Sequence, residues 1–429
     1  MHKRRDINAL SASDVQDYIH ALGILRARSI ANTDDPAGYD FHARRHNDME
    51  VGPCEHGNDL FFAWHRCHLH YFEQLLRAAD PPRTSNVSIP YWDWSRPDPQ
   101  GGRYPASFDL PELKTNRFTD GKPLADDAIQ IVRQTPGWND FGGWPKGTPG
   151  KNYGAFESSP HNYMHGDYIG GMMGNPETAA EDSIYWSFHC FIDLLWSEWQ
   201  RRNPDEVGTS LDSPLRGFAG EANALTADFQ RTAALDYEYE YNKALATDFS
   251  QPSPPRLLGA LSSMGSLRAG FPGSLQNQFQ TAGNAPFVLP GGLLRARRTW
   301  LNLKRLDIPE VASFTLRVYI HPIVLRWQGQ PQQALAAYYT GYVSLWKVHA
   351  GGGHGGHGQG HQGAPHHPTS ADLRLDCTEV LLRLAAAGEL DLAATLEFLP
   401  ARLPNGDPPP IHQLIQQVTL SELTLEGML

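Results

Sequence analysis

Apolar side chains recur at helical spacing in four segments of the N-terminal half of the chain. These segments lie within residues 1–30, 59–79, 160–166 and 180–202. The last of them begins with acidic residues and ends with basic ones, as the helix dipole favours. Residues 95–155 are rich in Pro, Gly and Asn and are expected to form a long irregular connection. The pattern therefore predicts a bundle of helices.

The hydrophobic pattern changes after about residue 250, where Pro and Gly punctuation gives way to short β-type runs. The run FTLRVYI alternates as a half-buried strand does, and TWLNLKRL, YTGYVSLWKV, LRLDCTEVLLRL and ATLEFLP also have the composition of strands. We therefore predict a mainly α domain at 1–245, a linker at 246–284 and an all-β, sandwich-like domain at 285–429.

Composition and charge exclude several classes of protein. The net charge is −11 and no long Lys/Arg-rich run is present, which argues against a nucleic-acid partner. No stretch approaches ~18 consecutive apolar residues, so a membrane span is not expected. The first residues lack the apolar core of a secretory signal, which predicts a cytoplasmic protein. Four cysteines in 429 residues do not indicate a disulfide scaffold.

One group of histidines lies in the third and fourth predicted helices. His161 and His165 are spaced i, i+4, so their imidazoles project from one helix face and can reach one metal ion. His189 lies in the very apolar segment YWSFHCFIDLLW, where an imidazole must be satisfied and a metal ion is one means. Asp193, four residues later, is placed to orient His189 or a neighbouring ligand through the free ring nitrogen.

A second group of histidines has the same character. His65 lies in the apolar segment FFAWHRCHLHYFE, with His56 in CEHGN and His46 in ARRHND upstream of it. Sites made only of imidazoles suit copper or zinc rather than magnesium or calcium. His68 and His70 share the helix of His65 but lie off its face, and we expect them to be ordinary histidines.

The two groups lie in strings that resemble a known family. CEHGNDLFFAWHR, followed by YFEQLLR and IPYWDWS, resembles the first copper motif of tyrosinases and polyphenol oxidases. PHNYMHGDYIGGMMG, followed by YWSFHCFIDLLWSEW, is similar to the second. The resemblance covers about residues 1–245 and implies two copper ions per chain. It assigns one copper to His46, His56 and His65, and the other to His161, His165 and His189. His42 competes with His46, which we prefer because the Asn after it better matches the family's pattern.

The resemblance also assigns roles to residues that are not ligands. Cys54 stands where similar proteins form a thioether to His56, and an unmodified buried thiol is the alternative. Glu157 and Asn162 match the residues that hold a water near the second copper, which takes the proton from an incoming phenol. Relatives usually carry a histidine where this chain has Phe188, which puts the finer substrate preference in doubt.

The implied activity is oxidation of a small phenolic substrate by O₂, through hydroxylation of monophenols, oxidation of o-diphenols to o-quinones, or both. An o-aminophenol oxidase and a haemocyanin-like oxygen-binding protein are the alternatives. Tyr237 and Tyr239 resemble the Tyr-x-Tyr mark that closes the catalytic domain, and in some relatives the following β-domain covers the copper entrance. The Gly/His tract at 351–367 is expected to be a mobile loop that could capture copper, and formation of a homo-oligomer is left open.

Overall fold

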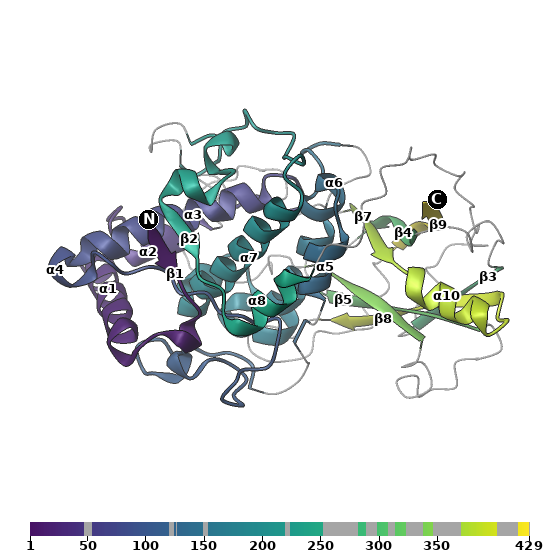
Figure 1. The fold of residues 1–429 in the computed structure, drawn as a ribbon, viewed down its shortest axis with the longest axis horizontal. Helices are drawn as coiled ribbons and strands as arrows, with labels where there is room; N and C mark the ends of the chain where they lie inside the picture. Colours follow the sequence, from purple (N-terminus) through teal and green to yellow (C-terminus); the bar gives the residue numbers. More distant parts are fainter. Residues whose placement is uncertain are drawn as a thin grey trace, which may run out of the picture.

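The structure is a computed structural model that describes residues 1–46, 54–119, 124–125, 127–148, 153–218, 224–251, 282–288, 298–307, 314–322, 338–345, 370–400 and 419–428. A helical part, which comes first in the sequence, lies beside a part made mostly of strands (Figure 1). This arrangement confirms the predicted fold class. Most of the predicted linker and the whole Gly/His tract lie outside the described residues, and the domain boundaries stay predictions.

The helical part is built around three long helices that the hydrophobic pattern predicted. They are α1 (Ala12–Ala31), α3 (Phe61–Ala79) and α7 (Ser183–Arg202), and α3 packs against both of the others. Ser11 and Asp14 form a capping box at the start of α1. The Asp182 carboxylate accepts the backbone N–H of Ile184 and so caps α7. These local signals explain why the helices begin where they do.

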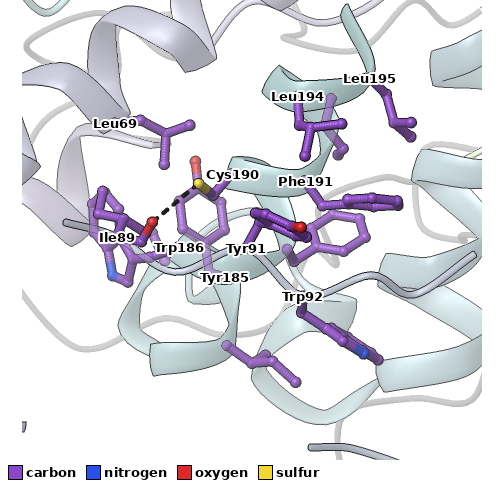
Figure 2. Close-up of a cluster of buried hydrophobic side chains, with 14 of the residues drawn as sticks. Leu69, Ile89, Tyr91, Trp92, Tyr185, Trp186, Cys190, Phe191, Leu194 and Leu195 are labelled. Carbon is purple, nitrogen blue, oxygen red and sulfur yellow. Dashed lines mark hydrogen bonds between the residues drawn. The ribbon is translucent and has the colours of Figure 1, made fainter. Parts of the chain in front are cut away.

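Aromatic side chains fill the space between these helices. The ring of Phe72 on α3 stacks on Trp186 of α7 with centroids 3.5 Å apart, and Phe141 stacks on Trp199 at 4.6 Å. Figure 2 shows the adjoining layer, in which side chains of α7 meet the extended segment around Ile89–Trp92. There the Cys190 thiol donates to the Ile89 carbonyl at 3.3 Å. Tight aromatic packing therefore fixes α7 in position.

Short elements surround these helices. Among its described residues, the connection expected to be irregular at 95–155 contains two short α-helices, α5 (Ala128–Gln134) and α6 (Trp138–Gly142), which corrects that expectation. Apolar side chains of both helices enter the aromatic core, and this tertiary packing outweighs the local abundance of Pro and Gly. The other short helices are α2 (Tyr39–Arg45), α4 (Pro81–Thr84), α8 (Lys243–Ser250), η1 (Ile7–Ala9), η2 (Ala106–Asp109), η5 (Gly171–Gly174), η6 (Ala179–Glu181), η7 (Thr226–Phe229) and η8 (Thr232–Leu235).

A buried ionic cluster joins the start of the chain to the end of the helical part. Strand β1 (His2–Arg4) pairs in parallel with β2 (Tyr237–Tyr239), the strand that carries the Tyr-x-Tyr motif. Arg4 donates to Glu73 at 2.6 Å and to Asp193 at 3.1 Å, and Arg66 donates to the other oxygen of Asp193 at 2.5 Å. Asp193 also accepts the phenol hydroxyls of both motif tyrosines. The cluster therefore braces α3 against α7.

The β part contains two antiparallel sheets. One has the strand order β3 (Ala282–Val288), β8 (Asp391–Pro400), β5 (Phe314–Pro322), β6 (Tyr339–Leu345). The other has the order β7 (Ser370–Asp376), β4 (Arg298–Asp307), β9 (Thr419–Met428). Apolar side chains of both sheets share one core, as a sandwich requires.

One element of the β part differs from its prediction. The run LRLDCTEVLLRL is a strand only as far as Asp376, and then becomes helix α10 (Thr378–Ala386). Val380, Leu381 and Leu384 lie on one face of this helix and pack into the sandwich core. The expected all-β domain therefore includes a helix. Among the described residues, no helix is long and apolar enough to cross a membrane.

Candidate metal centre

Six predicted ligand histidines come together from separate parts of the helical region. His46 is the residue at the end of α2, His65 lies in α3 and His189 in α7, while His56 precedes α3. His161 and His165 belong to two wide helical turns, η3 (Glu157–His161) and η4 (Met164–Ile169). All six side chains are buried. The fold thus gathers histidines more than 140 positions apart in the sequence into one interior cluster.

The segment around His161 is a π-helix rather than the predicted α-helix. Pro160 lies inside it and has no backbone N–H to donate, which favours a widened turn. Gly170 and Gly171 end the segment at φ values of +60° and +57°, where a side chain would be strained. A Cβ on Gly171 would also collide with the backbone carbonyl of Asn116. Two consecutive glycines therefore let the chain turn sharply behind the histidines.

The ring nitrogens of five histidines are oriented by oxygen acceptors. Four of the acceptors are carbonyl or amide oxygens that can only accept, so in those rings Nδ1 carries the proton and Nε2 keeps its lone pair for another partner. The fifth is the Glu157 carboxyl group, which accepts from His56 in the same way when it is ionised. This is the arrangement in which imidazole ligands of a metal ion are normally held. The Nδ1 contacts are His46 to the Pro176 carbonyl (2.8 Å), His56 to Glu157 (2.8 Å), His65 to the Phe61 carbonyl (2.8 Å), His161 to the Asn162 side-chain oxygen (2.9 Å) and His165 to the Met173 carbonyl (2.9 Å).

The ligand atoms converge closely enough to hold metal ions. His161, His165 and His189 offer nitrogens that all lie within 4.8 Å of one another, and so do His46, His65 and His189. The rings of His65 and His189 stack at 4.3 Å with an interplanar angle of 3°. Nε2 of His65 is buried and has no hydrogen-bond partner in the described structure. A metal ion among these nitrogens would satisfy it, so the residues fit a metal centre.

Burial keeps these imidazoles neutral. Desolvation lowers the pKa of His65, His165 and His189 well below the usual value, and neighbouring histidines lower it further. Desolvation also lowers the pKa of His46 to about 4, against the opposing effect of its bond to the Pro176 carbonyl. Metal ligation requires the neutral imidazole, so the site is ready for a metal ion near pH 7 without first losing protons.

The structure places His46, and not His42, in the cluster. The Nε2 atom of His42 lies 2.8 Å from the Pro36 carbonyl, so its ring is engaged elsewhere. The ring centroids of His46, His56 and His65 lie 5.2 to 5.8 Å apart. The ligand atoms that lie within 4.8 Å of one another nevertheless group His46 either with His65 and His189 or with Cys54 and His56. The two predicted sets therefore meet in one continuous cluster.

Glu157 lies against the first set of histidines. One carboxylate oxygen is the partner of His56 Nδ1, and both oxygens lie 3.0 Å from the backbone N–H of Gly57. Burial raises the pKa of Glu157 well above its usual range, which the Gly57 hydrogen bond only partly offsets. This carboxyl group can therefore hold or release a proton at an unusually high pH for a glutamate.

Asn162 joins the second set of histidines to the β part of the molecule. Its side-chain oxygen faces His161, and its amide donates to the Ser344 carbonyl on β6 at 2.8 Å. Two further contacts tie the same segment to the sandwich: the rings of Tyr163 and Tyr342 lie 4.9 Å apart, and Thr315 hydrogen-bonds Asp167. The sandwich thus packs directly on the turns that carry His161 and His165.

Three other residues singled out in the sequence have defined places. Asp193 does not orient a ligand histidine, which corrects that expectation, because two buried arginines and two tyrosines take its oxygens. The ring of Phe188 packs edge-on against His165 at 4.8 Å. Cys54 is a buried free thiol whose sulfur lies within ligand distance of His46 and His56.

Sequence reasoning missed several partners of the site. Arg66 follows His65 directly and is fully buried, and an arginine within so apolar a helix was the signal that a buried carboxylate lay opposite. His68, expected to be ordinary, is also fully buried and hydrogen-bonds the His42 carbonyl and the Tyr185 hydroxyl. No sequence pattern predicted the contact between His68 and Tyr185, because His68 lies in α3 and Tyr185 in α7.

Comparison with known proteins agrees with this geometry. Residues 34–122 and 109–202 match the model of the common central domain of tyrosinase. The chain is 29% identical over 225 residues to tyrosinase HcTyr1 of Hahella sp., which covers 46% of this chain and 48% of that relative. These matches support a domain of the tyrosinase family at residues 34–202, and that family implies copper binding.

The chain is also similar to a hemocyanin, and it shares its fold with a plant tyrosinase. A-type hemocyanin of Enteroctopus dofleini is 25% identical over 280 residues, covering 56% of this chain and 22% of that protein. Latent apple tyrosinase superposes with a TM-score of 0.71 at 18% identity, covering 100% of this chain and 97% of that one. This last likeness establishes a shared fold. The chain spans about half or less of HcTyr1 and hemocyanin, so it does not inherit their activity from these matches.

Proposed function

We propose that the protein is a dicopper oxidase that uses O₂ to hydroxylate monophenols, oxidise o-diphenols to o-quinones, or both. The observation that carries the proposal is the cluster of six buried histidines, five of which hold Nδ1 against an oxygen atom, so that Nε2 is the atom that would ligate a metal ion. A set of imidazoles with no carboxylate among its closest groups favours copper over hard cations.

In this proposal each copper has three histidine ligands. His46, His56 and His65 would hold one ion, and His161, His165 and His189 the other. The pair of coppers would supply the binding and reduction of O₂. The chain's own part is to keep the ligands neutral and oriented, and to exclude water through the aromatic shell around them. Phe188, packed on His165, would help to shape the phenol site.

Proton transfer from the substrate is assigned to Glu157 and Asn162. A phenol must lose its proton before oxidation, and burial raises the pKa of Glu157, which makes it a stronger proton acceptor than an ordinary carboxylate. A water held between Glu157 and Asn162 would carry the proton. Glu157 also fixes His56, so the same carboxyl group would couple ligand orientation to proton transfer.

A haemocyanin-like oxygen carrier is the second candidate function. The observation that favours it is the close packing of β6 on the segment of His161, together with the hemocyanin match. A carrier would bind O₂ reversibly but exclude a phenol. An o-aminophenol oxidase would keep turnover but would not need a phenol-deprotonating group.

The test combines metal analysis with substrate trials on the copper-loaded full chain. The proposal predicts two coppers per chain, a new absorption band on adding hydrogen peroxide, and turnover of a diphenol. Trials with a monophenol and an o-aminophenol then separate the oxidase types. The band without turnover of any of the three substrates would favour the oxygen carrier, and protein grown with copper that contains only zinc would refute both.

A further inference from the structure

A buried tyrosine lies between histidines of the two proposed copper sets. The ring centroid of Tyr185, on α7, is 4.4 Å from that of His189 and 4.9 Å from that of His46. Its side chain is only 1% exposed. The phenol ring therefore touches ligands assigned to both coppers, in a place that bulk water does not reach.

The hydroxyl of Tyr185 has a base as its partner. Nε2 of His68 lies 2.8 Å from the His42 carbonyl, which can only accept, so this nitrogen carries the proton. Nδ1 of the neutral ring then keeps its lone pair, and it faces the Tyr185 hydroxyl at 3.2 Å. The hydrogen bond consequently runs from the phenol to the imidazole. His68 is fully buried, so no water competes for it.

Further aromatic side chains continue outward from this pair. Trp186 lies next to Tyr185 on α7, as Figure 2 shows, with ring centroids 5.1 Å apart. Its indole N–H donates to the Tyr39 hydroxyl at 3.0 Å. The Tyr39 hydroxyl in turn contacts the backbone carbonyl of the exposed residue Glu181. A series of oxidisable rings thus leads from the ligand histidines toward the surface.

We propose that Tyr185 is an internal one-electron donor to the oxygen-charged centre, with His68 as the acceptor of its proton. The inference rests on the proposed function, which supplies O₂ or hydrogen peroxide at copper as the oxidant. Tyr185 gives one electron to that oxidant, and its O–H bond breaks. The proton forms a new N–H bond at Nδ1 of His68. The products are a neutral phenoxyl radical and an imidazolium that still donates to the His42 carbonyl.

The step matters when no phenol occupies the site. A phenol that can pass its proton to a neighbouring base is easier to oxidise than the imidazoles around it. The oxidant at copper, which then has no phenol to oxidise, therefore oxidises Tyr185 rather than His46 or His189. Trp186 is the next aromatic ring toward the surface, so the electron vacancy can move from Tyr185 to Trp186 without oxidising a ligand histidine.

The test is electron paramagnetic resonance on copper-loaded full-length protein frozen soon after addition of hydrogen peroxide without phenol. We expect a tyrosyl radical whose signal narrows when the protein is made with ring-deuterated tyrosine. Tyr185→Phe should lose this signal while it keeps its copper and its peroxide absorption band. Peptide mapping should then show several-fold more oxidation of His46 and His189 in this variant.

The matched control is Tyr18→Phe. Tyr18 is also buried, but it has no ring contact with a ligand histidine among the described residues, so its loss should leave the radical unchanged. His68→Gln, which removes the base, should weaken the signal and serves if Tyr185→Phe does not fold. Copper and the peroxide band without a tyrosyl radical in the unmodified chain would overturn this inference alone, as would a radical that survives Tyr185→Phe. Absence of copper would overturn the proposed function first.

Discussion

The two sets of histidines differ in what holds them. His46 and His65 are oriented by backbone carbonyls of the helical part, and His56 by a carboxylate of the same part. His161 is oriented by Asn162, and Asn162 is in turn held by the Ser344 carbonyl of β6. The first set is therefore complete within the helical part, whereas the second set depends on the sandwich for one of its supports.

This difference separates the part of the molecule that binds the metal from the part that influences activity. A ligand oriented within its own domain keeps its position whatever the neighbouring domain does. A ligand whose supporting residue is shared with another domain responds when that domain moves or is removed. We therefore expect changes in the helical part to alter metal binding and stability. The second set of ligands itself lies in the helical part, so changes in the sandwich should act through Asn162 on activity while copper content stays constant.

The largest expected effect comes from removing a central ligand. His65→Ala and His189→Ala should each lose copper and abolish oxidase activity, because the two stacked rings link both sets. Metal analysis and oxygen uptake would measure this. His70→Ala is the matched control, since His70 shares α3 but lies outside every close ligand group among the described residues. Full activity in His65→Ala would contradict the assignment.

The buried ionic cluster should dominate stability. Asp193→Ala leaves Arg4 and Arg66 buried without their carboxylate, and should lower the free energy of unfolding by about 3–5 kcal/mol. Chemical denaturation would measure it. Asp34→Ala, which breaks the exposed pair with Arg44, should change stability little. Equal effects in the two variants would show that the cluster does not brace the helices.

Cleavage between the two parts should change activity without changing the metal. Cutting near residues 250–285 and removing the sandwich would free Asn162 from Ser344, and should raise diphenol oxidation several-fold at constant copper content. The reason is that the sandwich packs on the turns carrying His161 and His165, and so restrains the phenol site. The alternative is that the sandwich only stabilises the fold. Folded, copper-loaded, cut protein with unchanged or lower turnover would decide for it.

The pH dependence of stability should include a contribution from His42, which is not a ligand. Burial and the nearby Arg45 lower its pKa to about 4, from 6.5 when it is free. The unfolded chain takes up the proton first, so stability is lost as pH falls from about 6.5 toward 4. Between about pH 7 and pH 5 the loss is about 2 kcal/mol. His42→Gln should flatten this part of the curve in urea titrations, and an unchanged slope would refute the assignment.

The smallest expected effect comes from a covalent bond between Cys54 and His56. The Cys54 sulfur lies within 4.8 Å of a ring nitrogen of His56, and a thioether between the two residues would lock the imidazole that Glu157 already orients. Mass spectrometry of the peptide should then show a mass short by two hydrogens and a thiol that resists alkylation. Cys54→Ser, which retains the hydrogen, is the control. A freely alkylated Cys54 in active, copper-loaded protein would rule the bond out.

Much of the frame was predictable because it depends on local periodicity. The spacing of apolar residues predicted α1, α3 and α7, and the alternation in FTLRVYI predicted β5. The spacing of His161 and His165 put both imidazoles on one side of the chain even though the turns there are π-helical. Local sequence failed at α10, where packing of three apolar side chains into the sandwich outweighed a strand-like composition.

The amino-acid sequence by itself determined the kind of site, because ligand chemistry is a property of residue type: six imidazoles favour copper or zinc over hard cations wherever the chain places them. Only the tertiary structure decided the partners of those residues. It directed Asp193 to Arg4 and Arg66, chose His46 over His42, set Glu157 on His56 and joined Asn162 to β6. The contacts of Asp193, Glu157 and Asn162 each span a long stretch of chain, and the direction of a side chain across such a distance is fixed by packing rather than by spacing.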